Sequence, residues 1–313
     1  MPTTTPRLRP ILAAAITIIA LLAPALAQAE RVTIATYNVE NFFDRFDNPF
    51  TNDEQTEIKR LDDIRRLAAT VRAVDADVIG FQELENEQVL DAFNRQHLAG
   101  MGYDHVVCLP SNDGRGITLG FLSRLSVLGA TTHRWEHIPH RGSEDTHRFA
   151  RDLLRVTVAV PGGRTLEVFN VHFKSKGSRS GDPQSVGWRS AEAVRSRAIV
   201  NRLLADNPEA LIAFLGDFNS EPTDPAAQAF FDPAGEGTPL IDLLADRPAD
   251  QRFTYVFGNF PPAVFDYIAA SPALAEYVVP RSVRVMPKTA AARGSDHLPV
   301  VATFDIPPAP AQR

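Results

Sequence analysis

The amino-acid sequence predicts an α/β protein whose β-sheets are covered by helices. Strand-like and helical segments are mixed along the whole chain, and the connections between them include both βα units and a hairpin. A chain of 313 residues with 44% hydrophobic residues can bury a full core. No repeat or long linker divides the central region, so we expect one domain over residues 30–305.

The first half of this domain begins with a strand, a helix and a second strand. Residues 31–37 tend to alternate between apolar and polar side chains, as a half-buried strand does. Residues 57–74 show the spacing of an amphipathic helix, with apolar side chains three and four positions apart at Ile58, Leu61, Ile64, Leu67, Val71 and Val74. The apolar run at 77–82 predicts a short buried strand that ends at Glu83.

Strand patterns dominate the rest of the domain. Residues 116–122, 152–160 and 165–171 have strand patterns, and the turn sequence at 161–164 joins the last two as a hairpin. A helix is expected at 188–205 and an apolar strand at 211–215. The remaining strand-like segments are 265–270, 277–285 and 298–304.

The N-terminal residues 1–29 are typical of a secretory signal peptide. Arg7 and Arg9 precede an apolar run, and Ala27-Gln28-Ala29 has the small-x-small pattern of a cleavage site. An uncleaved anchor helix over 11–27 is the alternative, but Pro24 and the cleavage pattern favour export to the periplasm or beyond the cell. We expect no transmembrane segment after cleavage following Ala29, and a flexible Pro/Ala-rich tail at 306–313.

Composition restricts the partners that the exported protein can bind. Cys108 is the only cysteine, so no intramolecular disulfide can form, and its apolar setting predicts a buried core thiol. Loss of Arg7 and Arg9 with the signal peptide leaves 30 basic and 38 acidic residues, a formal charge of −8. An acidic protein needs a local basic patch or a divalent metal to hold a polyanion. We expect a monomer with no obligate protein partner.

Acidic, amide or imidazole side chains follow apolar runs at five places. These motifs are NVE with Asn38 and Glu40, QELE with Glu83 and Glu85, NVHF with Asn170 and His172, GDFN with Asp217 and Asn219, and GSDHLPV with Asp296 and His297. Each motif stands where a strand is expected to end. The sequence therefore predicts an active site that is assembled from distant segments.

Two of these motifs pair residue types that suit metal and proton chemistry. Asp217 and Asn219 would leave the same face of an extended chain, where they can orient a water molecule or bind a hard cation. A turn at the strand end is the alternative. Asp296 beside His297 suits metal ligation next to proton transfer, and a helix N-cap or turn formed with Ser295 is the alternative.

Three further residues are ambiguous when each is taken alone. Glu83 ends a buried strand, where a carboxylate needs a metal or a partner such as the cation of a salt bridge. Asn38 has the alternative of a turn amide. His172 has the alternative of a core histidine whose hydrogen bonds are satisfied within the protein.

The order of the motifs resembles the endonuclease/exonuclease/phosphatase superfamily, which includes DNase I-like nucleases, inositol polyphosphate 5-phosphatases and bacterial sphingomyelinases. The matching segments are YNVENFFD, FQELE, NVHFKSKG, GDFNSEP, FDYIAAS and GSDHLPV, and they span residues 32–304. The resemblance implies a DNase I-like four-layer α/β sandwich in which two packed, mostly antiparallel sheets are flanked by helices. Strand and helix patterns alone are compatible with other α/β arrangements.

The resemblance also implies roles for individual residues. On the metal side it places Glu83 as the direct Mg²⁺ ligand with Asn38 and Asp296 near it, and Mn²⁺ or Ca²⁺ are alternatives to Mg²⁺. The implied catalytic residues are His172 at the scissile phosphate, Asp217 and Asn219 at the attacking water, and His297 oriented by Asp266. Arg151 matches, more loosely, a phosphate-contacting arginine. Whether His297 acts as a base or stabilises the charged phosphate stays open.

A basic segment follows His172 and bears on the substrate. Its cations are Lys174, Lys176, Arg179, Arg189, Arg195, Arg197 and Arg202. On an acidic protein, such a segment suits a nucleic-acid backbone, and Lys174 and Lys176 are the nearest phosphate-binding candidates. For Arg195, Arg197 and Arg202 the solvated face of a helix is the stronger interpretation.

The segment that starts HFKSKG is also similar to the bacterial extracellular nuclease branch, although the loop lacks the cysteines that relatives often carry. We therefore expect an exported Mg²⁺-dependent nuclease that cleaves DNA or RNA with little sequence preference. A sphingomyelinase-like phospholipase C, or another lipid or small-molecule phosphoesterase, is the enzyme alternative. Its membrane-docking residues would be Phe46 and Phe50, or Phe257, Phe260 and Phe265. A binding module with an inactive site is a third hypothesis.

Overall fold

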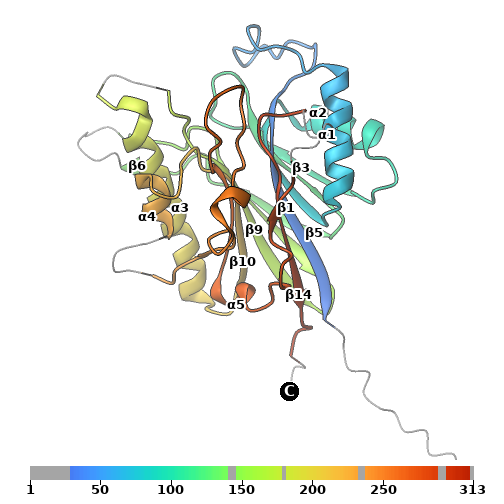
Figure 1. Cartoon of the computed structure of the whole chain (residues 1–313), viewed down its shortest axis with the longest axis vertical. Helices are drawn as coiled ribbons and strands as arrows, with labels where there is room; N and C mark the ends of the chain where they lie inside the picture. Colours follow the sequence, from blue (N-terminus) through green and yellow to red (C-terminus); the bar gives the residue numbers. More distant parts are fainter. Residues whose placement is uncertain (1–28, 140–145, 178–180, 232–236, 288–293, 311–313) are drawn as a thin grey trace, which may run out of the picture.

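The computed structural model contains two six-stranded sheets packed face to face, with helices on both outer faces (Figure 1). It describes residues 29–139, 146–177, 181–231, 237–287 and 294–310. Figure 1 shows α1 and α2 on one side of the sheet pair and α3 and α4 on the other. The arrangement is the predicted four-layer α/β sandwich.

The first sheet is antiparallel except for one central parallel pair. Its strands, in spatial order, are β13 (Arg284–Val285), β14 (Val300–Ile306), β1 (Glu30–Phe42), β2 (Val78–Leu84), β4 (Thr118–Ser123) and β3 (His105–Leu109). Only β1 and β2 run parallel to each other.

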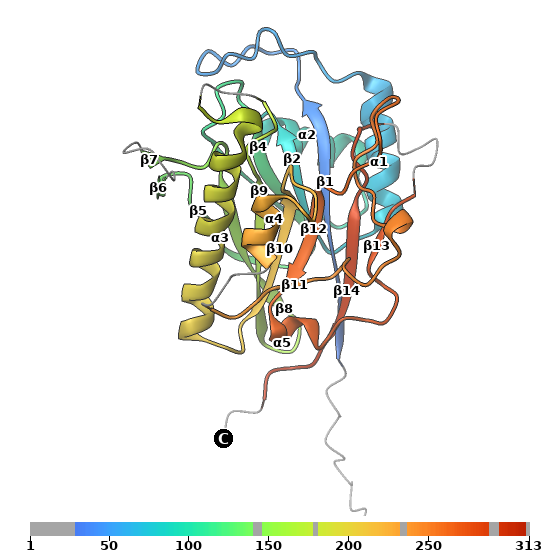
Figure 2. The same cartoon turned by 60° about the vertical axis from the view of Figure 1, so that its left-hand side comes forward.

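The second sheet repeats this pattern. Its order is β11 (Ile241–Asp242), β12 (Asp266–Ala270), β10 (Leu211–Asp217), β9 (Arg164–His172), β8 (Leu153–Val160) and β5 (Val127–Thr132), and only β9 and β10 are parallel. A separate two-stranded ribbon pairs β6 (Ile138–Pro139) with β7 (Thr146–His147). The central strands β1 and β10 lie beside each other across the sheet interface (Figure 2).

In the described part of the chain, four helices form the outer layers, and a fifth, short helix follows β12. Their bounds are α1 (Leu61–Val74), α2 (Glu87–His97), α3 (Val186–Asp206), α4 (Pro225–Phe231) and the short α5 (Pro272–Ala275). Short 3₁₀ turns occupy Pro183–Ser185 and Ala249–Gln251. No helix among the described ranges is long and apolar enough to cross a membrane.

Three apolar layers hold the sandwich together. Side chains such as Ile34 and Leu215 are fully buried between the sheets. Leu67 of α1 and Phe93 of α2 pack on the outer face of the first sheet, and Val200 of α3 packs with the outer face of the second. Burial of such side chains on three interfaces is the main force that stabilises the fold.

Most of the predicted elements are present, and their bounds differ by a few residues. The hairpin at 161–164 joins β8 to β9 as predicted. The prediction of a buried thiol at Cys108 is also confirmed: the thiol lies 3.0 Å from the hydroxyl of Thr118, and burial raises its pKa to about 12.

The predicted start of the first helix at 57 is wrong. The helix begins at Leu61, and Ile58 is 55% exposed. Lys59 accounts for the difference: its backbone N–H donates to the Phe43 carbonyl and its ammonium donates to the Glu40 carbonyl, 2.7 Å away. These bonds tie the segment to the end of β1, so it cannot join the helix.

The strand predicted at 277–285 is also wrong for most of its length. Only Arg284–Val285 forms a strand there. Pro280 has no N–H to donate to a ladder, and Arg281 has a left-handed backbone with φ of 64°. Before this point the chain meets β14 through an isolated bridge between Val278 and Phe304. It then turns, and the Ser282 N–H donates to the Val279 carbonyl at 3.1 Å.

The structure describes only part of the two predicted terminal segments. Residues 1–28 of the predicted signal peptide lie outside the described residues. At the other end, β14 runs to Ile306, and the N–H of Ala309 donates to the Gly162 carbonyl at 2.8 Å. The start of the Pro/Ala-rich segment is therefore attached to the β8–β9 hairpin.

Gly216 allows β9 and β10 to pack closely just before Asp217. Its φ is +136°, and a Cβ atom there would lie 2.1 Å from the Val171 carbonyl oxygen. Gly216→Ala should reduce the free energy of unfolding by about 2–4 kcal/mol, because backbone atoms would have to move. Urea unfolding measures this loss. Gly129→Ala is the matched control, because its added Cβ meets no atom within 4 Å; equal stability of the two variants would contradict the argument.

Candidate active site between the two sheets

Strand register brings the predicted site residues of the second sheet side by side. Asp217 at the end of β10 is paired with Asp266 of antiparallel β12 on one side. On the other side it is paired with His172 of parallel β9. Residues 45 or more positions apart in sequence thus form one row across the sheet.

The first sheet supplies a second row that faces this one. Asn38 of β1 is in register with Gln82 of β2, directly before Glu83. The Asn38 side-chain amide donates to Asp217 Oδ2 at 3.0 Å and to Glu83 Oε1 at 3.3 Å. One amide therefore connects the two sheets at the site.

The backbone around these residues departs from regular strand geometry. The register shifts after Asn38 in β1 and after Gln82 in β2. Glu83, Glu40 and Asn41 have positive φ values of 64°, 52° and 46°. Such bulges redirect side chains at a strand end, and the Asn41 N–H donates to Glu83 Oε2 at 2.8 Å. The local strain thus fixes the direction of the Glu83 carboxylate.

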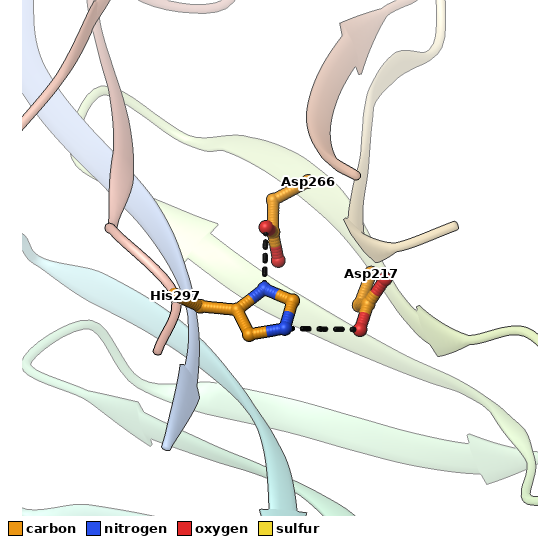
Figure 3. A group of neighbouring side chains, drawn as sticks. All are labelled: Asp217, Asp266 and His297. Atoms are coloured by element: carbon orange, nitrogen blue, oxygen red, sulfur yellow. Dashed lines mark hydrogen bonds and ion pairs between the residues drawn. The ribbon is translucent and has the colours of Figure 1, made fainter. Parts of the chain in front are cut away.

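His297 is held between two carboxylates (Figure 3). Its Nδ1 donates to Asp266 Oδ2 at 2.7 Å, and its Nε2 lies 3.8 Å from Asp217 Oδ2. The ring also packs against Tyr255, with 5.0 Å between ring centroids. Burial alone would lower the pKa of His297, but the charges of Asp266 and Asp217 outweigh it and raise the pKa to about 10. His297 is therefore a cation at neutral pH.

Asp217 Oδ2 is the atom that the surrounding groups share. Asn38 donates to it, His172 Nε2 lies 3.4 Å away and His297 Nε2 lies 3.8 Å away. Oδ1 of Asp217 accepts from the Asn219 N–H at 2.7 Å. Burial raises the pKa of Asp217 to about 7, so this carboxylate can exchange a proton near neutral pH.

His172 differs from His297 in its electrostatic environment. Burial and the nearby Arg151 and His297 charges hold its pKa well below the usual range. Its Nδ1 is buried and has no hydrogen-bond partner among the described residues. The site therefore contains one neutral and one protonated imidazole on either side of Asp217.

Further carboxylates lie near His297, whose Nε2 is 4.0 Å from Asp296 Oδ1. The pKa of Asp296 is raised by burial and by the Glu83 charge. The pKa of Glu40 is raised by burial and then by the Asp296 charge, while Lys59, 3.8 Å away, counteracts this. Carboxylate oxygens are the ligands that Mg²⁺, Ca²⁺ and Mn²⁺ prefer, so these residues are candidates to hold a divalent cation.

Another set of potential ligand atoms is less suited to a metal. Asp217, Asp266 and His297 each offer an atom within 4.8 Å of the others. However, Nδ1 of His297 is engaged by Asp266, and a protonated imidazole cannot bind a metal. Glu83 and Asp296, whose charges interact, are the residues that would hold a divalent cation, although among the described residues they do not form a compact three-ligand group with Glu40.

The sequence matches the model of the Endonuclease/Exonuclease/phosphatase family over residues 33–245. The chain belongs to this family. Together with the site geometry, membership makes the protein a metal-dependent phosphodiester hydrolase. Comparison with curated protein sequences gives no significant match.

Solved structures of family enzymes share the fold at low sequence identity. The catalytic domain of human nocturnin is 17% identical, with a TM-score of 0.61 over 88% of this chain and 94% of its own. A family protein from Bacteroides vulgatus is 17% identical, with a TM-score of 0.60 over 88% and 99% of the two chains. D. rerio TDP2, solved with a single-stranded DNA product, is 19% identical, with a TM-score of 0.57 over 88% and 98%.

In this family member, the three predicted phosphate-binding cations occupy different settings. Arg151 is buried, 3.1 Å from Asp113, and donates to the Phe173 carbonyl. The Lys174 ammonium lies 5.8 Å from the Trp188 ring centroid. Lys176 forms a 3.1 Å ion pair with Asp224 and lies over the Phe265 ring. Of the three, Arg151 and Lys174 are close enough for their charges to act on His172.

The basic segment is not a continuous cationic surface. Arg195 pairs with Glu136, and Arg202 donates to the Ala198 carbonyl of its own helix. Arg197 is 3% exposed and donates to the Thr238 carbonyl, so the interpretation as a solvated face is wrong for this residue. Arg179 lies outside the described residues.

Two residues of α3 position the chain after His172, and sequence reasoning missed this role. The Glu192 carboxylate accepts from the N–H groups of Ala150 and Lys174, both at 2.6 Å. Arg189, which was counted among the basic patch, is buried and donates to the Lys174 carbonyl at 2.8 Å. A carboxylate and a guanidinium thus hold both sides of Lys174. Nothing in the local helix pattern signals this, because the bonded backbone groups lie outside the helix.

Glu192 should make stability depend on pH. Burial raises its pKa from an ordinary 4.5 to about 7, so the folded chain keeps a proton that the unfolded chain has released. The resulting stabilisation is complete below about pH 4.5 and is lost as the pH rises through 7. Between these limits, the free energy of unfolding of the wild type should fall by roughly 3 kcal/mol relative to Glu192→Gln. Urea unfolding of both proteins at several pH values measures this, and a constant difference would contradict it.

Proposed function

We propose that the protein is an exported, Mg²⁺-dependent nuclease that hydrolyses DNA or RNA with little sequence preference. The proposal depends on one arrangement: protonated His297, held by Asp266, faces Asp217 beside the carboxylates of Glu83 and Asp296. The His297 cation would bind a phosphate oxygen and the carboxylates would act on the metal or the attacking water, so none of these groups reads a base. A site of this kind favours cleavage that is insensitive to sequence.

The residues divide the chemistry of phosphodiester hydrolysis among them. A water oxygen must attack phosphorus while its proton is accepted, and negative charge on the phosphoryl oxygens must be stabilised. Asp217, with a pKa of about 7, would accept the proton, while the Asn219 N–H holds its other oxygen in place. His297 remains a cation and would face the phosphoryl oxygens, so it acts as a stabiliser and not as the base.

Glu83 and Asp296 would hold the Mg²⁺ ion. When bound, this ion supplies positive charge to the phosphoryl and leaving oxygens. Asn38 would keep Glu83 in position, because its side-chain NH₂ donates to Glu83 while its side-chain oxygen Oδ1 accepts from the Glu40 N–H at 3.0 Å. Neutral His172 would complete the phosphate side without adding another charge beside His297.

Nucleic acid is the substrate class that fits the surroundings of the site. Arg151 and Lys174 lie next to His172, and the protein is acidic overall, with a formal charge of −6. Local cations at an acidic protein's catalytic site suit an extended phosphate backbone. The single-stranded DNA product held by D. rerio TDP2 is a precedent within the same fold.

Export is proposed from residues 1–29. Their basic start, apolar run and Ala27-Gln28-Ala29 site have the composition of a signal peptide. Cleavage after Ala29 would leave Glu30 as the first residue, and β1 begins at Glu30. The proposed cut would therefore leave the folded domain intact.

A lipid phosphodiesterase is the second candidate, and exposed aromatic side chains favour it. Phe257 and Phe260 are 47% and 68% exposed and stack on each other, while Phe50 is 93% exposed. Exposed aromatic side chains of this kind can enter a lipid surface. They are few, however, and the cations near His172 would serve a lipid phosphate as well as a nucleic-acid phosphate.

One assay distinguishes the two candidates. The purified protein is given plasmid DNA, RNA and sphingomyelin vesicles, each with Mg²⁺ and with EDTA. We expect Mg²⁺-dependent cleavage of nucleic acid, reduced about 100-fold or more in Glu83→Ala and His297→Ala because metal binding and charge stabilisation are lost. Asp62→Ala, which removes an exposed carboxylate of α1, should retain full activity.

Two outcomes would contradict the nuclease proposal. The first is release of phosphocholine from vesicles with nucleic acid left intact. The second is cleavage that survives both active-site substitutions in folded protein, since another site would then be responsible. Circular dichroism spectra of the variants show whether they are folded.

A further inference from the structure

A groove of about 540 Å³ lies beside the candidate active site. His147, Arg148, Lys174 and Trp188 are among the residues that line it. Lys174 is two residues beyond His172. Asp113, on the same wall, pairs with Arg151, whose charge acts on His172. The groove and the active site therefore share a wall.

The groove contains a flat aromatic platform. The rings of His147 and Trp188 are stacked, with centroids 4.7 Å apart and planes inclined by 20°. The indole N–H of Trp188 donates to the Arg148 carbonyl at 3.0 Å, which fixes the plane of the indole. Two chain segments 41 positions apart thus form one preorganised stack.

Lys174 and Arg148 line the same groove as this platform. The Lys174 ammonium lies 5.8 Å from the Trp188 centroid, and the main chain of Lys174 is held on both sides by Glu192 and Arg189. Arg148 is exposed, and its guanidinium lies 4.9 Å from the ring of Trp135, which is itself 55% exposed. Among the described residues lining the groove, the one acid is Asp113, which Arg151 neutralises.

We propose that this groove is a base-binding subsite for single-stranded nucleic acid. An unpaired base would extend the His147–Trp188 stack, while Lys174 and Arg148 bind the phosphates that flank it. Aromatic platforms lined with cations bind single strands in this way, since every base offers a flat π-face. Bases within a duplex are already stacked on both faces and cannot use the platform. The inference depends on the proposed nuclease function and specifies its substrate as a single strand.

Tryptophan fluorescence can measure binding separately from catalysis. The chain has two tryptophans, Trp135 and Trp188, so substituting the first leaves the second as the reporter. In Trp135→Phe, the fluorescence reports Trp188 alone. Titration with oligothymidylate in EDTA should quench this fluorescence. An oligomer of the same length, in which abasic linkers replace the thymidines, should quench it much less. Equal quenching by both, or no quenching by either, would overturn the subsite even if the enzyme cleaves nucleic acid.

Kinetics test the contribution of the platform to cleavage. In Trp188→Ala, kcat/KM on oligothymidylate should fall about 10- to 100-fold, the effect of losing one stacked base. The fall on bis-p-nitrophenyl phosphate, which has no base, should be no more than about threefold. Trp188→Phe should recover most of the activity on oligothymidylate, because it restores an aromatic face. Arg65→Ala, on the exposed side of α1, is the control for substitution itself.

The outcomes separate failure of the subsite from failure of the proposed function. Equal losses on both substrates would assign Trp188 a structural role and overturn the subsite. Preference of the wild type for duplex over single-stranded DNA would overturn it as well. If oligothymidylate quenches the fluorescence but the protein cleaves no nucleic acid, the base-binding subsite is supported and the proposed nuclease function is overturned.

Discussion

One buried oxygen atom, Oδ2 of Asp217, is the point on which the site depends. It receives a hydrogen bond from Asn38 of the opposite sheet and lies within 4 Å of Nε2 on both His172 and His297. A buried carboxylate is costly unless its neighbours stabilise it. The amide of Asn38 and the imidazoles of His172 and His297 offset the cost of burying this charge, and hydrolysis needs the same groups. The contacts that stabilise the buried carboxylate therefore also assemble the site.

This requirement explains several features of the two sheets. Each sheet places its parallel pair at the centre, and the carboxyl ends of these pairs carry the site residues. Behind the site, the Gln82 amide donates to Asn170 at 2.6 Å, so a polar contact also joins the sheets where apolar packing ends. Glu40, Asn41 and Glu83 have positive φ values, which are strained for residues other than glycine. This backbone strain accompanies the turning of their side chains toward the contact between the two sheets.

The sequence was informative wherever local chemistry decides structure. Apolar runs ending in Asp217 or Glu83 marked strands whose ends carry function, and these residues meet in the structure. Residues whose partners are backbone groups of distant segments could not be assigned. In the sequence, Arg197 is indistinguishable from a surface cation, but in the structure it donates to the Thr238 carbonyl. Glu192 likewise has the pattern of a counter-charge to the basic segment, but in the structure it accepts from two backbone N–H groups. The helix α2, capped by Asn86, was also missed because its apolar stripe is short.

The central claim is that residues of both sheets act as one catalytic unit through Asp217. A double-mutant cycle with Asn38→Ala and Asp217→Asn, with kcat/KM measured on bis-p-nitrophenyl phosphate in Mg²⁺, tests it most directly. The claim predicts strong non-additivity, in which the double variant is no more than about threefold slower than the slower single variant. Losses that multiply would show that the two residues act independently and would contradict it.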